Sequence, residues 1–320
     1  MNTIAVGKPA SFRAGEIIRQ FSIVLVFFLI VAFFSFASPY FMSWPNWLNL
    51  VRQSSINGIL AIGVTFVILT KGIDLSVGSV MAIAGMIAAS LVTETNEHFV
   101  LIGILAGLAV GAGLGLVNGV LVAAIKVPPF VVTLGMLSVA RGLTLIFSQG
   151  SPIPNLSDAY KWIGSGQVMY IPVPIIILFL VFIIGWVVLN YTTFGRYVYA
   201  VGGNEKAART SGISTKIIVG ATYVISGLLA GLAGLVLTAR TTAALPQAGI
   251  GYELDAIAAV VIGGTSLAGG RGSLLGTLIG ALIIGTINNG MDLMGVSSYY
   301  QQVLKGTIIV VAVIADQIRK

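Results

Sequence analysis

Ten apolar stretches, separated by shorter polar ones, run along most of the chain. They lie at about 21–38, 54–70, 76–93, 99–125, 129–147, 173–191, 217–239, 254–267, 274–295 and 300–317. A helix needs roughly 20 apolar residues to cross the hydrocarbon core of a bilayer. The pattern therefore predicts an all-α polytopic membrane protein with about ten transmembrane helices. The eighth stretch is short and the fourth is long, so we expect one of them to be broken or re-entrant.

The first stretch could also be read as part of a signal peptide, because Lys8, Arg13 and Arg19 precede it. Its apolar run from Phe21 to Ala37 is longer than the 7–15 residues usual for a signal peptide, and further apolar stretches follow. We therefore expect an uncleaved first span after a cytoplasmic segment, 1–20. Residues 1–320 are expected to form a single transmembrane domain, since no polar stretch is long enough to fold separately.

Composition agrees with a membrane setting. Hydrophobic residues make up 57% of the chain and charged residues 8%, whereas soluble domains carry about 25% charged residues. The chain has no cysteine, so disulfides and thiolate metal sites are excluded, and its single histidine, His98, is expected to be an ordinary surface residue. No metal-ligand spacing and no Ser/His/Asp set occurs, so neither a metal, a cofactor nor catalysis within the chain is expected.

The formal net charge of +7 could indicate a nucleic-acid partner. Lys and Arg collect in the cytoplasmic loops of membrane proteins, however, and this explains the charge without nucleic acid. With a cytoplasmic N-terminus, the inner loops hold Lys71, Lys126, Arg196, Lys206, Arg209, Lys216 and Arg271. Arg52 and Lys161 fall in outer connections, and the acidic residues fall mainly at span ends. We therefore expect both termini in the cytoplasm.

Spans two to five resemble spans seven to ten. Residues 56–61 (INGILA) match 225–230 (ISGLLA), residues 72–75 (GIDL) match 251–254 (GYEL), and Asn118-Gly119 match Asn289-Gly290. Five helices separate the copies, so the two copies would insert in opposite orientations. An inverted internal repeat of this kind is typical of transporters. The alternative is a chance similarity between helices rich in Gly and Ala.

A stripe of glycines follows the fourth stretch at every fourth position: Gly103, Gly107, Gly111, Gly115 and Gly119. Such a stripe predicts close packing between helix backbones, because small residues let membrane helices approach. No glycine cluster has the pattern of a phosphate-binding loop, so the chain is not expected to bind a nucleotide.

Polar residues within the spans are candidates for a translocation path, because they are costly in a membrane. The candidates are Asn57, Thr65, Asn118, Thr133, Ser138, Asn288 and Asn289. The competing interpretation is that they form hydrogen bonds between helices. Asp74 and Glu253, at equivalent positions of the repeat, are expected to cap helix N-termini rather than to bind substrate.

The longest inner connection, 192–216, is too polar to span and too patterned for a plain linker. Asn204 is a suitable N-cap, 205–209 are compatible with a helix, and Gly212 suits a C-cap. We expect a short helix across the cytoplasmic face, with small Ala207 and Ala208 fitting a groove on a partner. The alternative is a solvated connection.

Several motifs resemble those of the monosaccharide ABC permeases. In the connection, Gly195-Arg196 is followed by GGNEKAAR at 202–209 and SGI at 211–213. The others are GIDLSVGS at 72–79, GYELDAIAAVVIGGTSLAGG at 251–270, NNG at 288–290 and GVSSYYQ at 295–301. The resemblance extends from about Ser38 to the C-terminus. It implies that the connection couples the permease to an ATPase through Gly195, Arg196, Gly203, Asn204, Glu205, Ala207, Ala208, Arg209 and Gly212.

The family implies a homodimeric permease, two ATP-binding domains that are often fused in one tandem polypeptide, and a periplasmic sugar-binding protein. We therefore expect a multi-pass permease of the bacterial inner membrane that imports a monosaccharide and leaves ATP hydrolysis to its partner. Ribose is favoured, although several pentose and hexose permeases share these motifs. The alternative is an ion-coupled secondary sugar transporter, which would need an ionisable residue deep in the membrane. A non-transporting receptor would not explain the patterned connection.

Overall fold

The computed structural model describes residues 10–94 and 99–318, most of them helical. His98 and residues 1–9 of the N-terminal segment lie outside the described residues. The first half contains α1 (Ala10–Ala37), α2 (Trp44–Leu69), α3 (Val77–Leu91), α4 (Val100–Ala123), α5 (Pro129–Ser148) and α6 (Asp158–Ser165). After strands β1 (Gln167–Val168) and β2 (Ile171–Pro172) come α7 (Val173–Tyr191), α8 (Thr193–Gly203), α9 (Glu205–Thr210), α10 (Thr215–Thr241), α11 (Tyr252–Ile262), α12 (Leu274–Leu293) and α13 (Ser298–Ile318).

A helix covers each of the predicted apolar stretches. In the described part of the chain, six helices are long and apolar enough to cross a membrane: α2, α4, α5, α7, α10 and α12. The apolar part of α1, Ile23–Ala37, and α3 are shorter. The eighth stretch is short as predicted, since α11 has only 11 residues. The first helix begins earlier than predicted, because it already includes Ala10.

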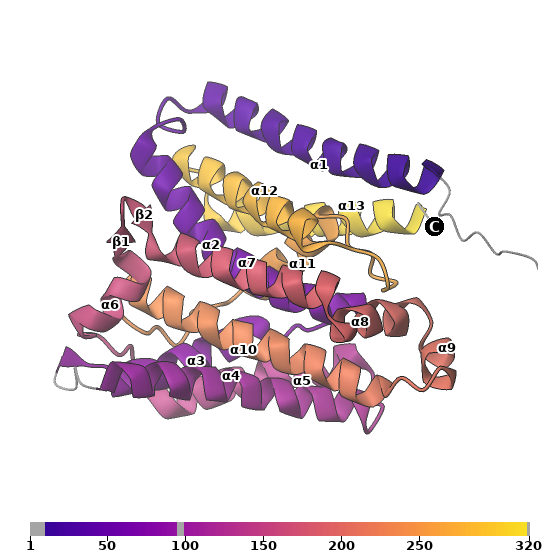
Figure 1. Cartoon of the computed structure of the whole chain (residues 1–320). Coiled ribbons are helices and arrows are strands. Elements are labelled where there is room, and N and C mark those ends of the chain that lie inside the picture. The colour runs from indigo at the N-terminus through magenta and orange to yellow at the C-terminus, as the bar shows by residue number, and fades with distance from the viewer. Residues whose placement is uncertain (1–9, 95–98, 319–320) are drawn as a thin grey trace, which may run out of the picture.

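The helices lie side by side and run across the view of Figure 1. At the right-hand end of the bundle lie α8, α9, the beginning of α1 and the end of α13. At the left-hand end lie α6 and the hairpin of β1 and β2, whose register pairs Val168 with Ile171. Neither α6, α8 nor the hairpin was predicted from the apolar pattern, because all three are short and lie between the apolar stretches.

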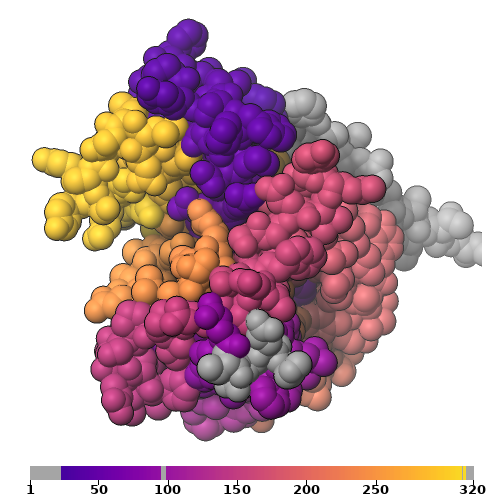
Figure 2. All heavy atoms as spheres, turned by 90° about the vertical axis from the view of Figure 1, so that its left-hand side faces the viewer, coloured from indigo at the N-terminus to yellow at the C-terminus, as the bar shows by residue number. Residues whose placement is uncertain are grey.

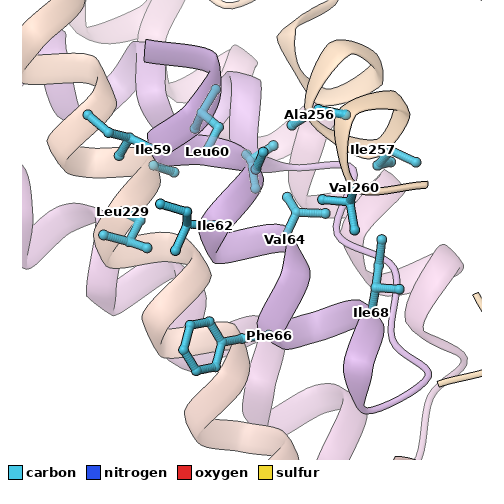
Figure 3. Close-up of a cluster of buried hydrophobic side chains, with 14 of the residues drawn as sticks. Ile59, Leu60, Ile62, Val64, Phe66, Ile68, Leu229, Ala256, Ile257 and Val260 are labelled. Carbon is cyan, nitrogen blue, oxygen red and sulfur yellow. The ribbon is translucent and has the colours of Figure 1, made fainter. Parts of the chain in front are cut away.

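The core of the bundle is built around α2, in which every residue from Ser54 to Leu69 is buried. Figure 3 shows Ile62 and Leu229 facing each other between α2 and α10, while Val260 of α11 approaches α2 from another side. In contrast, α4, α5 and α7 have large apolar side chains on their exposed faces, such as Leu105, Leu143 and Leu180. These outer faces suit contact with lipid.

The glycine stripe of α4 packs closely against other helices, as predicted, and three of its five glycines meet the backbone of α10. A Cβ atom on Gly111 would meet the carbonyl oxygen of Gly227 and the backbone of Gly231. A Cβ on Gly115 would meet the carbonyl oxygen of Tyr223. The two helices therefore touch backbone to backbone, a distance that only glycine permits here.

Candidate functional site

The two short helices, α3 and α11, begin inside the bundle and their N-termini meet. Gly78, in the first turn of α3, lies against Gly249, just before α11: a Cβ on either glycine would collide with the carbonyl oxygen of the other. Non-helical segments, 70–76 and 242–251, lead into the two helices. Gly249 and Gly251 have φ of 79° and 85°, which glycine adopts at little cost.

The two short helices run in opposite directions from this meeting point. The end of α3 reaches the α6 side, where the Ser157 amide donates to the Val92 carbonyl at 2.8 Å. The segment after α11 reaches the end of α2, where the Gly270 amide donates to the Leu69 carbonyl at 2.9 Å. Helix N-termini carry partial positive charge and unpaired amides. Two such ends inside a membrane bundle mark a place where polar groups can interact with a solute.

Asp74 satisfies the beginning of α3 and ties it to its neighbours. Its Oδ1 accepts from the Ser76 amide at 3.0 Å and from Ser76 Oγ at 2.6 Å, and its Oδ2 accepts from Ser226 Oγ of α10 at 2.8 Å. Asn118 of α4 donates to Ser76 Oγ at 2.9 Å. Asp74 is 1% exposed. It therefore serves the helix N-terminus as predicted, but it lies deep in the bundle rather than at a surface end.

Charged side chains from two outer helices hold the beginning of α11. Lys305 of α13 donates to Asp255 Oδ2 at 3.0 Å, and Asn288 of α12 donates to the same oxygen at 3.2 Å. On the other side, Arg141 of α5 donates through Nη1 to the Pro246 and Ala248 carbonyls at 2.6 and 2.9 Å.

The Glu253 carboxylate completes this first turn of α11 by accepting from the Gly251 amide at 3.3 Å. Asp255 is 4% exposed. Asp74 and Asp255 lie at helix ends, as predicted for the acidic residues, but these two ends are buried inside the bundle. The sequence did carry a signal for Arg141 and Lys305, because a charge within an apolar stretch is costly and commonly functional.

Most of the predicted path residues join helices to one another. Thr65 hydrogen-bonds Thr277 at 2.9 Å, Asn289 donates to Asn46 at 2.8 Å, and Thr133 donates to the Ile73 carbonyl at 3.2 Å. Asn118 and Asn288 make the contacts described above. Asn57 is 2% exposed, and its Oδ1 has no partner among the described residues. Ser138 differs, because it lies on the exposed face of α5.

The predicted short helix in the connection 192–216 is present as α9. The Asn204 side chain caps it by accepting from the Ala207 amide at 3.0 Å. At its other end Gly212 has φ of 82°, and the Ile213 amide donates to the Ala208 carbonyl at 3.1 Å, as in a glycine C-cap. A further helix, α8, precedes it, and Thr192 caps α8 by accepting from the Gly195 amide at 3.2 Å.

The two alanines of α9 face opposite directions. Ala207 is exposed, but Ala208 is 5% exposed and packs into the main core with Ile218. The expectation that both alanines face a partner is therefore wrong for Ala208. Gly195 is also buried, whereas Arg196, Gly203, Asn204, Arg209 and Gly212 are exposed.

Glu205 binds within the chain. Its Oε1 forms an ion pair with Lys126 Nζ at 2.9 Å and accepts from Thr215 Oγ1 at 3.3 Å. The Lys126 hydrogen bond holds the pKa of Glu205 below its usual range. The pair therefore stabilises the folded protein above the ordinary pKa of a glutamate, and this stabilisation is lost as the pH falls.

The α8–α9 segment rests on the ends of the core helices. A Cβ on Gly202 would collide with the Leu69 carbonyl oxygen at the end of α2 and would approach the Gly270 amide. Tyr199 of α8 donates to the Gly272 carbonyl at 3.0 Å. A force on this segment would therefore reach both α2 and the segment that follows α11.

These features define a class of protein. Short helices meet inside an apolar bundle, and a capped helix lies on one of its ends. This is the architecture of a membrane transport component.

Similarity to known protein sequences identifies the family. A family model described as "Branched-chain amino acid transport system / permease component" matches residues 46–313, and the chain belongs to this family. It is 47% identical to the ribose import permease protein RbsC of Escherichia coli K12, over 99% of each chain. It is also 47% identical to the RbsC of Haemophilus influenzae, over 97% of this chain and 96% of that one.

A third relative is the D-allose transport system permease protein AlsC of Escherichia coli K12. It is 42% identical over 91% of this chain and 89% of the relative. No solved structure matches the chain. The chain is a membrane permease, a transport component rather than an enzyme.

Proposed function

We propose that this permease is the membrane-spanning subunit of an ABC importer that carries a monosaccharide, ribose first, across the inner membrane of a bacterium. The observation that carries the proposal is the full-length similarity to ribose import permeases, at 47% identity over 99% of both chains. The family description names amino acids, but the relatives that cover the whole chain are named for sugars. A neutral sugar also suits a chain in which the charges at the α11 start already bind partners within the protein.

The architecture that we propose has ten crossings and an inverted repeat of α2–α5 and α10–α13. Helix packing supports it. In the first half of the chain α3 packs on α4 and α5, and in the second half α11 packs on α12 and α13. Across the halves, α10 packs on α3 and α4, and α2 packs on α11 and α12. The pairs correspond one to one, and the α3–α11 meeting point lies where a pseudo-two-fold axis would pass.

The translocation path, in this proposal, follows the meeting point of α3 and α11. Two helix N-termini offer amides there, and Arg141 and Lys305 are only partly buried. A sugar bound weakly by such groups can leave again, which transport requires. Ser138, exposed on α5, and Asn57, whose Oδ1 has no partner among the described residues, remain candidate lining residues, whereas the five other polar candidates act first as contacts between helices.

Coupling to ATP hydrolysis would use the α8–α9 segment. Its exposed residues Arg196, Asn204, Ala207 and Arg209 would contact an ABC ATPase, whether separate or fused in tandem. ATPase closure would then push on α2 and on the segment after α11 through Gly202. A sugar-binding protein would deliver the substrate at the opposite end, beside α6, and a second copy of the permease would complete the importer.

Transport by the purified complex tests the proposal. Permease, ATPase and binding protein are reconstituted in liposomes, and uptake of labelled ribose is measured with ATP, with ADP, and with unlabelled ribose, allose, arabinose or leucine as competitors. We expect uptake that requires ATP and is competed by sugars. Competition by leucine alone would overturn the choice of substrate.

The buried carboxylates of Asp74 and Asp255 favour one rival function, an ion-coupled secondary transporter. The same liposomes test it with a sodium or proton gradient and no ATP. Uptake driven by either gradient in the absence of the ATPase would overturn the ABC mechanism.

A further inference from the structure

Residues 242–251, which connect α10 to α11, enter the bundle from the α6 end without forming a helix. Near that end, the backbones of Ala244 and Ile153 exchange two hydrogen bonds of 2.9 Å each. At the other end of the segment, Gly249 lies against Gly78 in the first turn of α3. The 15 residues of α3 run from there back to the α6 end, so Gly78 lies roughly 20 Å from that end. The segment therefore descends to about the middle of a bilayer.

One side of this segment is exposed: Ile250 is 61% exposed and Leu245 is 44% exposed. Figure 2 looks onto the α6 end, where orange atoms of the residues near 250 reach the surface between magenta atoms and the yellow atoms of α13. Backbone that is not helical is tolerated at membrane depth only inside protein or beside a water-filled cavity. The exposed side of the segment is therefore unsuited to lipid and suited to a water-filled path.

Arg141 of α5 holds the segment through two of its carbonyl groups. Its Nη1 donates to the Pro246 carbonyl at 2.6 Å and to the Ala248 carbonyl at 2.9 Å. A charged donor forms stronger hydrogen bonds than a neutral one, and a guanidinium on a membrane helix is costly unless it has such partners. Together with the pairing of Ala244 and Ile153, these bonds fix the position of the segment above the α3–α11 meeting point.

Glu253 offers Arg141 a second acceptor. Its carboxylate accepts from the Gly251 amide at 3.3 Å and lies close enough to Arg141 for the two opposite charges to attract. Gly249 and Gly251, on either side of Ile250, have φ of 79° and 85°, a conformation that glycine adopts and leaves at little cost. The guanidinium can thus exchange the two carbonyls for a neighbouring carboxylate while the backbone turns at the two glycines. Two alternative sets of contacts give the segment two discrete arrangements, as a gate requires.

We propose that residues 242–251 form a re-entrant gate on the α6 side of the path, and that Arg141 is the positioning residue that keeps this gate closed. In the closed state Arg141 binds the Pro246 and Ala248 carbonyls, as described above. In the open state it turns to Glu253, the segment moves away from Gly78, and the α3–α11 meeting point becomes accessible from the α6 side. The inference rests on the proposed transport function, because a gate serves a protein only where a solute passes.

Thiol labelling tests the role of Arg141 on the full chain, which has no cysteine of its own. Met81 of α3 is buried, and its Cε lies 2.9 Å from the place where a Cβ on Gly249 would be, so Met81→Cys reports on the space beneath the gate. In intact cells, Arg141→Gln should raise the rate at which Met81→Cys reacts with a membrane-impermeant maleimide by about tenfold, because the hydrogen bonds to a charged donor are lost. Arg141→Lys keeps a charged donor and should react at an intermediate rate. Lys161→Gln removes a charge from α6 at the same end and should leave the rate unchanged. An unchanged rate in Arg141→Gln, or an equal rise in Lys161→Gln, would overturn the proposal.

A reversible lock tests the movement without a substitution at Arg141. Antiparallel residues that exchange both hydrogen bonds have Cα atoms about 5.5 Å apart, which suits a disulfide between Ile153→Cys and Ala244→Cys. Oxidation should abolish ATP-driven ribose uptake by the reconstituted complex, and a reducing agent should restore it, which a folding defect would not allow. The matched control is Thr93→Cys with Leu156→Cys, another antiparallel pair, which ties the same stretch to the end of α3 instead of to the gate. The control should transport equally well when oxidised and when reduced. Full uptake through the Ile153–Ala244 lock would overturn the proposal.

The exposed side of the segment gives a further test. Ile250→Cys should react with a small water-soluble thiosulfonate in opened membranes, because this side faces water. Complete protection, whether by lipid or by a second copy of the chain, would overturn the assignment of a water-filled path.

A failure of the gate is distinct from a failure of the proposed function. If the unmodified complex imports no ribose, the proposed function fails. The labelling of Met81→Cys needs neither sugar nor ATPase, so it still decides whether Arg141 holds the segment closed.

Discussion

The role of a side chain in this protein depends on which face of its helix the side chain lies on. Ala207 and Ala208 are adjacent and chemically identical, yet one is exposed and the other is 5% exposed. The Asn204 cap and the Glu205–Lys126 ion pair hold α9 in this rotation. In the proposed contact with an ATPase, α9 would therefore offer Asn204, Ala207 and Arg209, with Ala208 underneath.

Replacing either Ala207 or Ala208 by tryptophan distinguishes an effect on ATPase docking from an effect on folding. Ala207→Trp should leave the permease folded but abolish ATPase binding and ATP-driven uptake, because a bulky side chain at a docking contact prevents close approach. Ala208→Trp should instead destabilise the permease itself by about 1–3 kcal/mol or more, because the added volume must enter a packed core. Pull-down of the ATPase and thermal unfolding of the purified permease distinguish the two. If the Ala208→Trp permease unfolds at the same temperature as the unmodified permease but no longer binds the ATPase, α9 docks through the face that carries Ala208.

Small residues and isolated polar contacts hold several pairs of helices together, in addition to the large apolar side chains of the core around α2. The α4–α10 contact depends on glycine backbones, and the short helices α3 and α11 depend on side chains that α4, α5, α10, α12 and α13 supply. Lipid provides no hydrophobic drive that would bring helices together. Close backbone packing and internal hydrogen bonds must therefore hold the helices against one another.

Two glycines of α4 form a matched pair for testing helix packing. Gly111→Leu should lower the unfolding temperature and the yield of assembled permease, because its side chain would enter the backbone of α10, which cannot move aside. Gly113→Leu should be neutral or slightly stabilising, because nothing lies within 4 Å of its Cβ position and leucine favours helix by roughly 0.5–1 kcal/mol. Thermal unfolding in detergent measures both. Equal effects at the two positions would show that the stripe is not a packing surface.

The whole molecule has two chemically different ends. The end with α8 and α9 also holds the described chain termini, and the loops predicted for that side carry Lys71, Lys126, Arg196, Lys206, Arg209, Lys216 and Arg271. The opposite end holds α6, where Lys161 pairs with Asp158 at 2.7 Å. Positive residues favour the cytoplasmic side, so the α8–α9 end should face the cytoplasm.

Single cysteines in this cysteine-free chain test the orientation. Asp158→Cys should react with a membrane-impermeant maleimide in intact cells, because the Asp158 side chain is 93% exposed at the α6 end. Lys206→Cys should react only after the membrane is opened. Labelling of both positions from the same side would contradict the orientation and the count of ten crossings.

The sequence alone determined the features that depend on local chemistry. The length of each apolar stretch sets where a helix can lie in a bilayer, so helices occur at all ten predicted places. Asn204 and Gly212 end α9 because capping involves only the nearest backbone groups. The glycine stripe indicated close packing before its partner was known.

Only the tertiary structure decided which residues meet. Asp74 contacts Ser226, Asp255 contacts Lys305, and Arg141 contacts Ala248, all between segments far apart in the chain. Periodicity indicates that a side chain lies on one face of a helix, but it does not say which neighbour that face meets. For the same reason the burial of Ala208 and the meeting of α3 with α11 were not visible in the sequence. Both arise from packing across the bundle, where a polar or charged group is stable only if a distant residue supplies its partner.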